Sequence, residues 1–142
     1  MTALLDTCII VDALIDRAPF GESAKEILRL GAEKRLVLLC SAKTLLDVHY
    51  LLKHHLHDET KVRRIILALL KAITVVDVSG SACLSALNHP SGDYEDEVQG
   101  ECALEAGADY IVTRDHTGFI DSTVPAIEPS QFLDRFRSED GE

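Results

Sequence analysis

Short apolar runs alternate along this chain with segments of helical periodicity, and this alternation constrains the fold more than any other feature. The runs predict strands at Ala3–Leu5, Leu36–Leu39, Ile73–Val76, Tyr110–Val112 and Val124–Ile127. Between them, the spacing of apolar residues predicts helices around Ile27–Leu30, Leu45–Leu52, Val62–Leu70, Ser81–Leu87, Asp93–Ala106 and Ser130–Phe136. Strands that alternate with helices in this way predict an α/β fold with a parallel sheet.

The size of the chain predicts one domain. Its 142 residues, 46% of them apolar, suffice for one substantial core but not for two ordinary domains. We expect residues 1–137 to form this domain and residues 138–142 to form a frayed acidic tail. The four cysteines are scattered without metal-binding spacing, and neither a basic leader with a long apolar stretch nor a segment of transmembrane length is present. A soluble, cytoplasmic protein without a membrane partner is expected.

The charge balance limits how the protein can contact nucleic acid. There are 24 acidic against 14 basic residues, a formal net charge of −10. Proteins that coat nucleic acid rely on many Lys and Arg contacts to phosphate, so this class is disfavoured. Any such contact must use a bound metal ion and a local basic patch. Arg114 is our candidate for a phosphate contact, whereas Lys61, Arg63, Arg64 and Lys71 are interpreted as ordinary solvated charges.

Two aspartates follow predicted strands. Asp6 comes directly after Ala3–Leu5, and Asp115 lies just beyond Tyr110–Val112. In an open parallel sheet, ligands bind beyond the carboxyl ends of the strands, so both aspartates are placed for chemistry. Asp at these positions also commonly begins a loop or caps the next helix. The sequence leaves both interpretations open.

Asp47 lies inside a predicted helix with apolar neighbours. Asp is intrinsically unfavourable in the middle of a helix, and at the edge of a buried stripe it needs a partner. A metal ion, a salt bridge and an internal hydrogen bond each satisfy that need. The sequence does not choose among them.

Residues 93–97, DYEDE, place four acids in the first turn of a helix. The helix dipole and the unpaired amide groups favour negative charge there, which accounts for most of these acids. Helical geometry nevertheless puts Asp93 and Asp96 on one side and Glu95 on another. Gly100 shares that side, and we expect it to leave room beside Asp96.

Several carboxylates that converge on one site repel one another, and divalent cations commonly stabilise such an arrangement. Ligand sets made of oxygen alone select Mg²⁺ or Mn²⁺ over zinc. The chemistry that such ions support best is phosphodiester hydrolysis. The aspartates therefore predict a metal-dependent nuclease site built from Asp6, Asp47, Asp96 and Asp115.

Three segments in order, LLDTCIIVDAL, TLLDVHYLL and DYEDEVQGECALEAGADYIVTRD, followed by PAIEPSQFL, resemble the PIN-domain family. The similarity is strongest to the bacterial VapC-like subgroup, usually described as toxin components of toxin–antitoxin pairs. This resemblance implies a three-layer α/β/α fold around a central parallel sheet. It also implies Mg²⁺- or Mn²⁺-dependent ribonuclease activity on an RNA substrate, homodimers and, often, an antitoxin partner.

The resemblance also implies roles for individual residues. Asp6 matches the first-strand aspartate of the family, Asp96 the acid that opens the long helix, and Asp115 the Asn or Asp after the Thr-Arg pair; these three are the candidate metal ligands. Asp47 stands where many relatives carry the longer Glu, so water-mediated metal binding is the expectation there. The supporting residues are expected to act as an outer carboxylate, a hydrogen-bond donor to an acid or a metal-bound water, and the phosphate contact; they are Asp93, Thr113 and Arg114.

Two further positions depart from the family pattern. Cys8 replaces the usual Asn or Ser, and Gly118 replaces the first residue of an Asp-Phe pair. Together with Asp47, they indicate a weakened or absent second metal site. The leading hypothesis is a metal-dependent endoribonuclease. The alternatives are a PIN-like binding module without catalysis and a structure-specific DNA nuclease.

Overall fold

A five-stranded parallel sheet forms the centre of the protein in the computed structural model, which describes residues 1–89 and 92–141. The strands are β1 (Thr2–Leu5), β2 (Val37–Ser41), β3 (Ile73–Val76), β4 (Tyr110–Val112) and β5 (Ala126–Ile127). They lie in the order β3-β2-β1-β4-β5, and every neighbouring pair is parallel. The predicted α/β fold with a central parallel sheet is confirmed.

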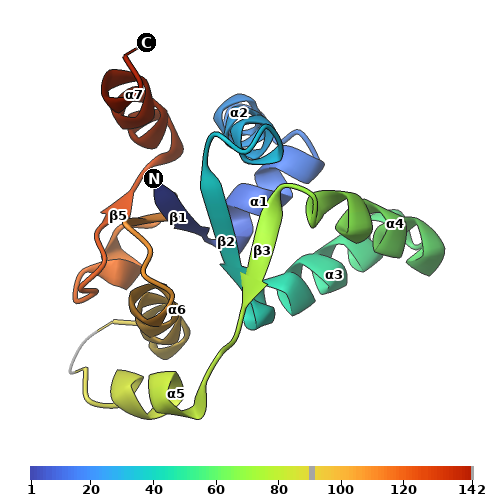
Figure 1. The fold of residues 1–142 in the computed structure, drawn as a ribbon. Helices are drawn as coiled ribbons and strands as arrows, with labels where there is room; N and C mark the ends of the chain where they lie inside the picture. Colours follow the sequence, from blue (N-terminus) through green and yellow to red (C-terminus); the bar gives the residue numbers. More distant parts are fainter. Residues whose placement is uncertain (90–91, 142) are drawn as a thin grey trace.

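Helices cover both faces of this sheet (Figure 1). They are α1 (Thr7–Leu14), α2 (Gly21–Ala32), α3 (Ala42–Leu56), α4 (Glu59–Leu69), α5 (Gly80–Ala86), α6 (Tyr94–Glu105) and α7 (Pro129–Glu139), with a 3-10 turn, η1, at Thr117–Phe119. Successive strand residues point to opposite faces, which creates two cores. Leu5 packs in the larger core with α1–α4 and α7, whereas Leu4 packs in the smaller one with α6 and η1. This is a three-layer α/β/α arrangement.

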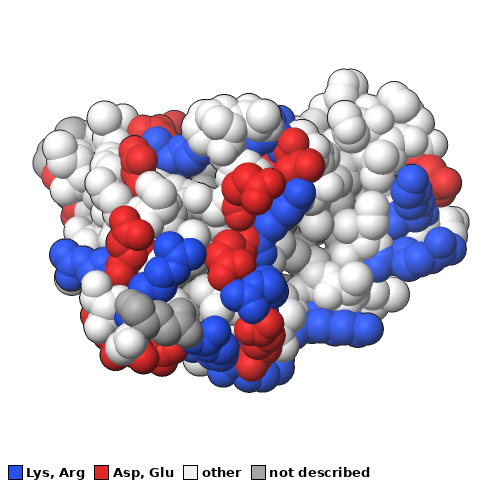
Figure 2. All heavy atoms as spheres, turned by 90° about the horizontal axis from the view of Figure 1, so that it is seen from above, with Lys and Arg blue, Asp and Glu red and all other residues white. Residues whose placement is uncertain are grey.

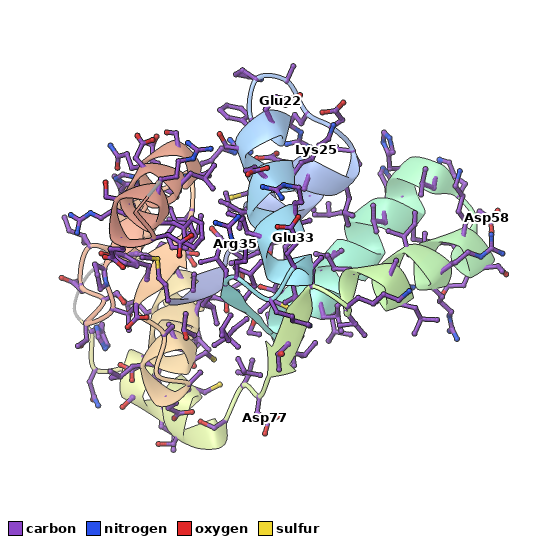
Figure 3. The ribbon with its side chains drawn as sticks, turned by 45° about the horizontal axis from the view of Figure 1, so that its top comes forward. Glu22, Lys25, Glu33, Arg35, Asp58 and Asp77 are labelled. Carbon is purple, nitrogen blue, oxygen red and sulfur yellow. The ribbon has the colours of Figure 1, made fainter. Side chains whose placement is uncertain are left out.

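The strands all end at the same edge of the sheet. Figure 3 shows the direction of the strands. Arg35, just before β2, lies at one edge of the sheet, and Asp77, just after β3, lies at the opposite edge. Figure 2 looks onto the top of the molecule in Figure 1, the side where β2 and β3 begin, and shows acidic and basic side chains interspersed. Along α2, for example, Arg29 pairs with both Glu26 and Glu33. Because ligands bind beyond the carboxyl ends of parallel strands, a ligand site is expected at the opposite edge, where the strands end.

Helix α1 is the element that the periodicity did not predict. Asp6 caps it, and its Oδ1 accepts a hydrogen bond from the amide of Thr7 at 2.8 Å. The helix runs through the middle of the larger core, so residues on several of its sides, Ile9 to Ala13, are buried. A helix buried in this way shows no polar face, and its apolar run is indistinguishable from a strand by pattern alone.

The C-terminal helix is longer than predicted. Helix α7 ends at Glu139, beyond the expected Phe136, and Arg35 Nη2 lies 2.6 Å from the carboxylate of Asp140. Residues 138–140 are thus partly helical and tied to the domain rather than frayed, while Glu142 of the expected tail lies outside the described residues. Over the described part of the chain, no helix has both the length and the apolar character needed to cross a membrane.

Candidate functional site

Asp6 lies where β1 passes into α1. Its amide donates to the carbonyl of Val112 at 3.0 Å, so it continues the β1–β4 ladder, while its Oδ1 caps the helix. Its Oδ2 accepts a hydrogen bond from Thr113 Oγ1 at 2.8 Å. The two interpretations that the sequence left open are therefore compatible, because Asp6 caps a helix and also presents a carboxylate at the ligand edge of the sheet.

Cys8 lies beside the same carboxylate. Its Sγ is 3.7 Å from Asp6 Oδ2, a weak hydrogen bond in which the thiol donates. Burial, and after it the negative charge of Asp6, raises the pKa of the Cys8 thiol. Cys8 thus stays a neutral thiol at ordinary pH and adds no charge to the site.

Asp96, in the first turn of α6, is the point around which other carboxylates gather. Asp93 caps this helix by accepting a hydrogen bond from the Asp96 amide at 3.2 Å. Partial burial, and after it the charges of Asp6, Asp93, Asp115 and Glu95, raise the pKa of the Asp96 carboxyl from 3.8 to about 6. The charges of Asp6, Asp93 and Asp115 thus all act on the carboxyl of Asp96.

Asp115 is exposed and held by the turn that follows it. Its Oδ1 accepts hydrogen bonds from Thr117 Oγ1 at 2.7 Å and from the Thr117 amide at 3.2 Å. These bonds, with one from the Gly118 amide, lower the pKa of Asp115. Its own amide donates to Thr113 Oγ1 at 3.0 Å, so Thr113 joins Asp115 to Asp6. The sequence expectation that Thr113 hydrogen-bonds an acid is met.

Gly118 lies against the carboxylate of Asp96. A Cβ added at Gly118 would overlap Asp96 Oδ2, so any side chain there would displace this carboxylate. Gly100 and Asp96 line the same small cavity, and a Cβ at Gly100 would come within 3.0 Å of Ser122 Oγ. Glycine at position 118, which departs from the family pattern, therefore allows η1 to lie close to α6.

Asp47 is paired with a cation of its own helix. Its two oxygens lie 2.8 and 2.7 Å from Lys43 Nζ, one helical turn earlier in α3. Lys43 Nζ also lies 3.9 Å from a carboxylate oxygen of Glu95 in α6. Of the alternatives that the sequence left open for Asp47, the structure shows the salt bridge.

Arg114 pairs with an acid inside the protein. Its Nε and Nη2 donate to the two oxygens of Asp12 at 2.7 and 3.2 Å, and its guanidinium lies 4.0 Å from the ring centroid of Phe20. These bonds use two of the five N–H groups of the guanidinium, and the side chain is 28% exposed, so the phosphate contact expected for Arg114 stays a prediction. Asp12 itself was missed, although a carboxylate inside the apolar run IIVDALI was a signal that some cation must meet it.

A buried polar chain beneath the acids was also missed. Thr44 Oγ1, fully buried, lies 3.2 Å from Thr7 Oγ1 and accepts a hydrogen bond from Gln99 Nε2 at 2.6 Å. These three side chains come from α1, α3 and α6. They tie together the helices that carry Asp6, Lys43 and Asp96, and nothing in the local sequence pattern indicated the connection.

The donor chemistry of this site fits a hard divalent cation. All four grouped side chains are carboxylates, and their mutual repulsion is what a divalent cation relieves. Within the described part of the chain, no three His, Cys, Asp or Glu side chains stand close enough to hold an ion as they are. Asp6, Asp96 and Asp115 are the residues that would hold one, with Asp93 next to them.

The sequence of the chain matches a family model described as a PIN domain over residues 2–117. The chain belongs to the PIN-domain family. No curated protein matches it. The PIN-domain match spans β1 to η1, and thus includes every carboxylate of the site described above.

Solved structures with this PIN-domain fold come from bacterial toxin–antitoxin systems. VapC20 of Mycobacterium tuberculosis, a toxin that cleaves the sarcin-ricin loop, is 18% identical with a TM-score of 0.67, covering 89% of this chain and 99% of the other. A chain of VapBC2 from Rickettsia felis, bound to a promoter DNA fragment, is 18% identical with a TM-score of 0.65 and coverages of 90% and 98%. A toxin–antitoxin complex from Klebsiella pneumoniae gives 20% identity, a TM-score of 0.63 and coverages of 89% and 97%. At these identities, the similarity establishes the fold alone.

Proposed function

We propose that this PIN-domain protein is a Mg²⁺- or Mn²⁺-dependent endoribonuclease and the toxin component of a toxin–antitoxin pair. One observation carries the proposal: carboxylates from the end of β1, the start of α6 and the end of β4 gather around Asp96 at the edge where the strands end. RNA is the proposed substrate because VapC20, a protein of the same fold, cleaves the sarcin-ricin loop.

The side chains of the site have distinct tasks in this proposal. A bound divalent cation polarises a phosphate oxygen and lowers the pKa of a water. Asp6 is held in one orientation by Thr113 Oγ1 and the Thr7 amide, so it presents a fixed oxygen. Asp115 is ionised over the working pH range because hydrogen bonds lower its pKa. In the metal-free protein, Asp96 binds a proton more readily than an ordinary Asp, because burial and the neighbouring carboxylates raise its pKa to about 6.

The test compares two identical substitutions in a nuclease assay. Asp96→Asn removes a carboxylate of the proposed metal site, whereas Asp47→Asn removes a carboxylate that forms a salt bridge with Lys43. With purified protein, a structured RNA and Mn²⁺ or Mg²⁺, we expect Asp96→Asn to abolish cleavage and Asp47→Asn to retain most of it. Cleavage that survives Asp96→Asn, or that persists in EDTA, would contradict the proposal.

Two controls separate the competing functions. A DNA of the same sequence and fold is assayed beside the RNA, and cleavage of DNA alone would favour the structure-specific DNA nuclease. Calorimetry with Mn²⁺ is done on wild type and on Asp6→Asn. Absence of any Mn²⁺ binding that Asp6→Asn removes would favour the binding module without catalysis.

We further propose that two copies associate through an apolar surface formed by α3, α5 and α6. A groove of about 770 Å³ between these helices is bordered by Leu46, Val78, Tyr94 and Val98. Large apolar side chains of α3 and of the segment around α5 are exposed; they are Leu46, Tyr50, Leu84 and Leu87. The exposed apolar side chains lie on or next to helices that border the groove, so a two-fold arrangement would let those side chains of each copy enter the groove of the other.

Association is tested by light scattering on matched variants. Leu46 in the surface and Leu67 on α4 outside it are 69% and 68% exposed. We expect Leu46→Glu to give a monomer and Leu67→Glu to leave a dimer. A monomeric wild type would contradict the proposal.

The proposed antitoxin is a protein encoded beside this chain. The support is the fold similarity to a chain of a toxin–antitoxin complex. Co-expression with the product of the neighbouring reading frame should yield a co-purifying complex in which RNA cleavage is inhibited. A neighbouring product that neither binds nor inhibits would remove the toxin assignment and leave the nuclease proposal standing.

A further inference from the structure

Asp12 is a fully buried carboxylate that the metal site does not use. It lies in α1, six residues after Asp6, and none of its surface is exposed. An unpaired charge that is fully buried strongly destabilises a fold, so the residues that pair with Asp12 indicate what it does. Those partners are Arg114, at 2.7 and 3.2 Å, and Arg17, whose Nε lies 3.7 Å from Asp12 Oδ1.

The two cations differ in how firmly they hold Asp12. Arg114 donates two hydrogen bonds in a fork to both carboxylate oxygens and lies on the ring of Phe20, so its guanidinium is fixed on two sides. Arg17 is half-exposed and reaches one oxygen at a longer distance. Arg114 thus makes the directional contact, and Arg17 adds a solvated charge.

Arg114 lies between the two residues that organise the site. Thr113 before it donates to Asp6 and accepts from the amide of Asp115, and Asp115 follows it directly. The end of β4 is therefore attached to α1 at two points. One is Thr113 on Asp6 at the start of the helix, and the other is Arg114 on Asp12, about 9 Å further along the helix axis.

The backbone ladder reaches Thr113, whose amide donates to the carbonyl of Ile127, and beyond it the fork of Arg114 on Asp12 fixes the direction in which the chain continues to Asp115. We infer that Asp12 and Arg114 are positioning residues, which hold Asp115 at a set distance from Asp6 and so preorganise the metal site. The inference rests on the proposed function. Neither residue touches the ion, since Asp12 is enclosed by Arg114 and Arg17. Partners that orient metal ligands commonly change metal affinity about 10- to 100-fold when they are replaced.

The test measures Mn²⁺ affinity by calorimetry on Arg114→Lys and Arg17→Lys. Both substitutions keep the positive charge near Asp12, and only Arg114→Lys removes the fork that attaches β4 to α1. We expect about 10- to 100-fold weaker Mn²⁺ binding for Arg114→Lys and wild-type affinity for Arg17→Lys. Circular dichroism at the titration temperature confirms that the protein measured is folded.

If the Asp12–Arg114 pair only stabilises the fold, a different result is expected. Arg114→Lys would then lower the melting temperature but leave the Mn²⁺ affinity of the folded protein at the wild-type value. That outcome would overturn the inference. Equal losses for Arg17→Lys and Arg114→Lys would overturn it too, as would failure of Arg114→Lys to fold, since the pair would then serve folding alone. A wild type that binds no Mn²⁺ overturns the proposed function itself, which distinguishes the two failures.

Discussion

Replacing Asp96 by asparagine is expected to stabilise the metal-free protein while it removes metal-dependent cleavage. Burial, and after it the neighbouring carboxylates, raise the pKa of Asp96 from 3.8 to about 6. The folded state therefore disfavours the ionised form relative to the unfolded chain. Above a pH of about 6 this penalty is fully present; it shrinks between about 6 and 4 and is absent below, where both states are protonated.

The size of the effect follows from the same numbers. A pKa difference of one corresponds to about 1.4 kcal/mol, so the rise from 3.8 to about 6 gives a ceiling of about 3 kcal/mol. Asp96 is only partly buried, and water screens part of this repulsion. We expect Asp96→Asn to raise the free energy of unfolding by about 1–2 kcal/mol at neutral pH, and by much less near pH 4.

Urea denaturation in EDTA, at about pH 7.5 and about pH 4, measures this directly. A gain of this size moves the midpoint by about 0.5–1 M urea. The control Asp47→Asn breaks the exposed pair with Lys43 and should lower stability by about 0.3–0.5 kcal/mol at neutral pH. Adding Mn²⁺ should stabilise wild type but not Asp96→Asn. A variant no more stable than wild type at pH 7.5, or equally stabilised at both pH values, would refute the reasoning.

Three further outcomes are expected. Mn²⁺ affinity measured by calorimetry should weaken as the pH falls below about 6, because Asp96 then binds a proton in competition with the ion; an affinity independent of pH between 5 and 7.5 would contradict this. Gly118→Ala should cost about 1–3 kcal/mol in urea denaturation and weaken Mn²⁺ binding, because the new Cβ overlaps Asp96 Oδ2. Thr113→Val should weaken Mn²⁺ binding about 10-fold or more by releasing Asp6 and the Asp115 amide; an unchanged affinity speaks against Thr113 as an organiser of the site.

The fold was largely predictable from local pattern. Ile73–Val76 and Tyr110–Val112 were predicted at the bounds that the structure shows, because short apolar runs between helical segments are typical of buried parallel strands. Asp6 and Asp115 were identified for a related reason, since the ends of parallel strands share one edge wherever the strands lie in the sheet. Helix α1 was missed because a helix buried on most of its surface lacks the polar positions that mark its period.

What the sequence determined by itself is the alternation of strands and helices, the parallel sheet and the aspartates at its carboxyl edge, because these follow from spacing along the chain. Which side chains meet was decided by the tertiary structure. Asp6 accepts a hydrogen bond from Thr113, and Asp12 is paired with Arg114. Each of these pairs joins residues more than a hundred positions apart, and its geometry depends on the packing of α1 against the end of β4. No local pattern carries that information.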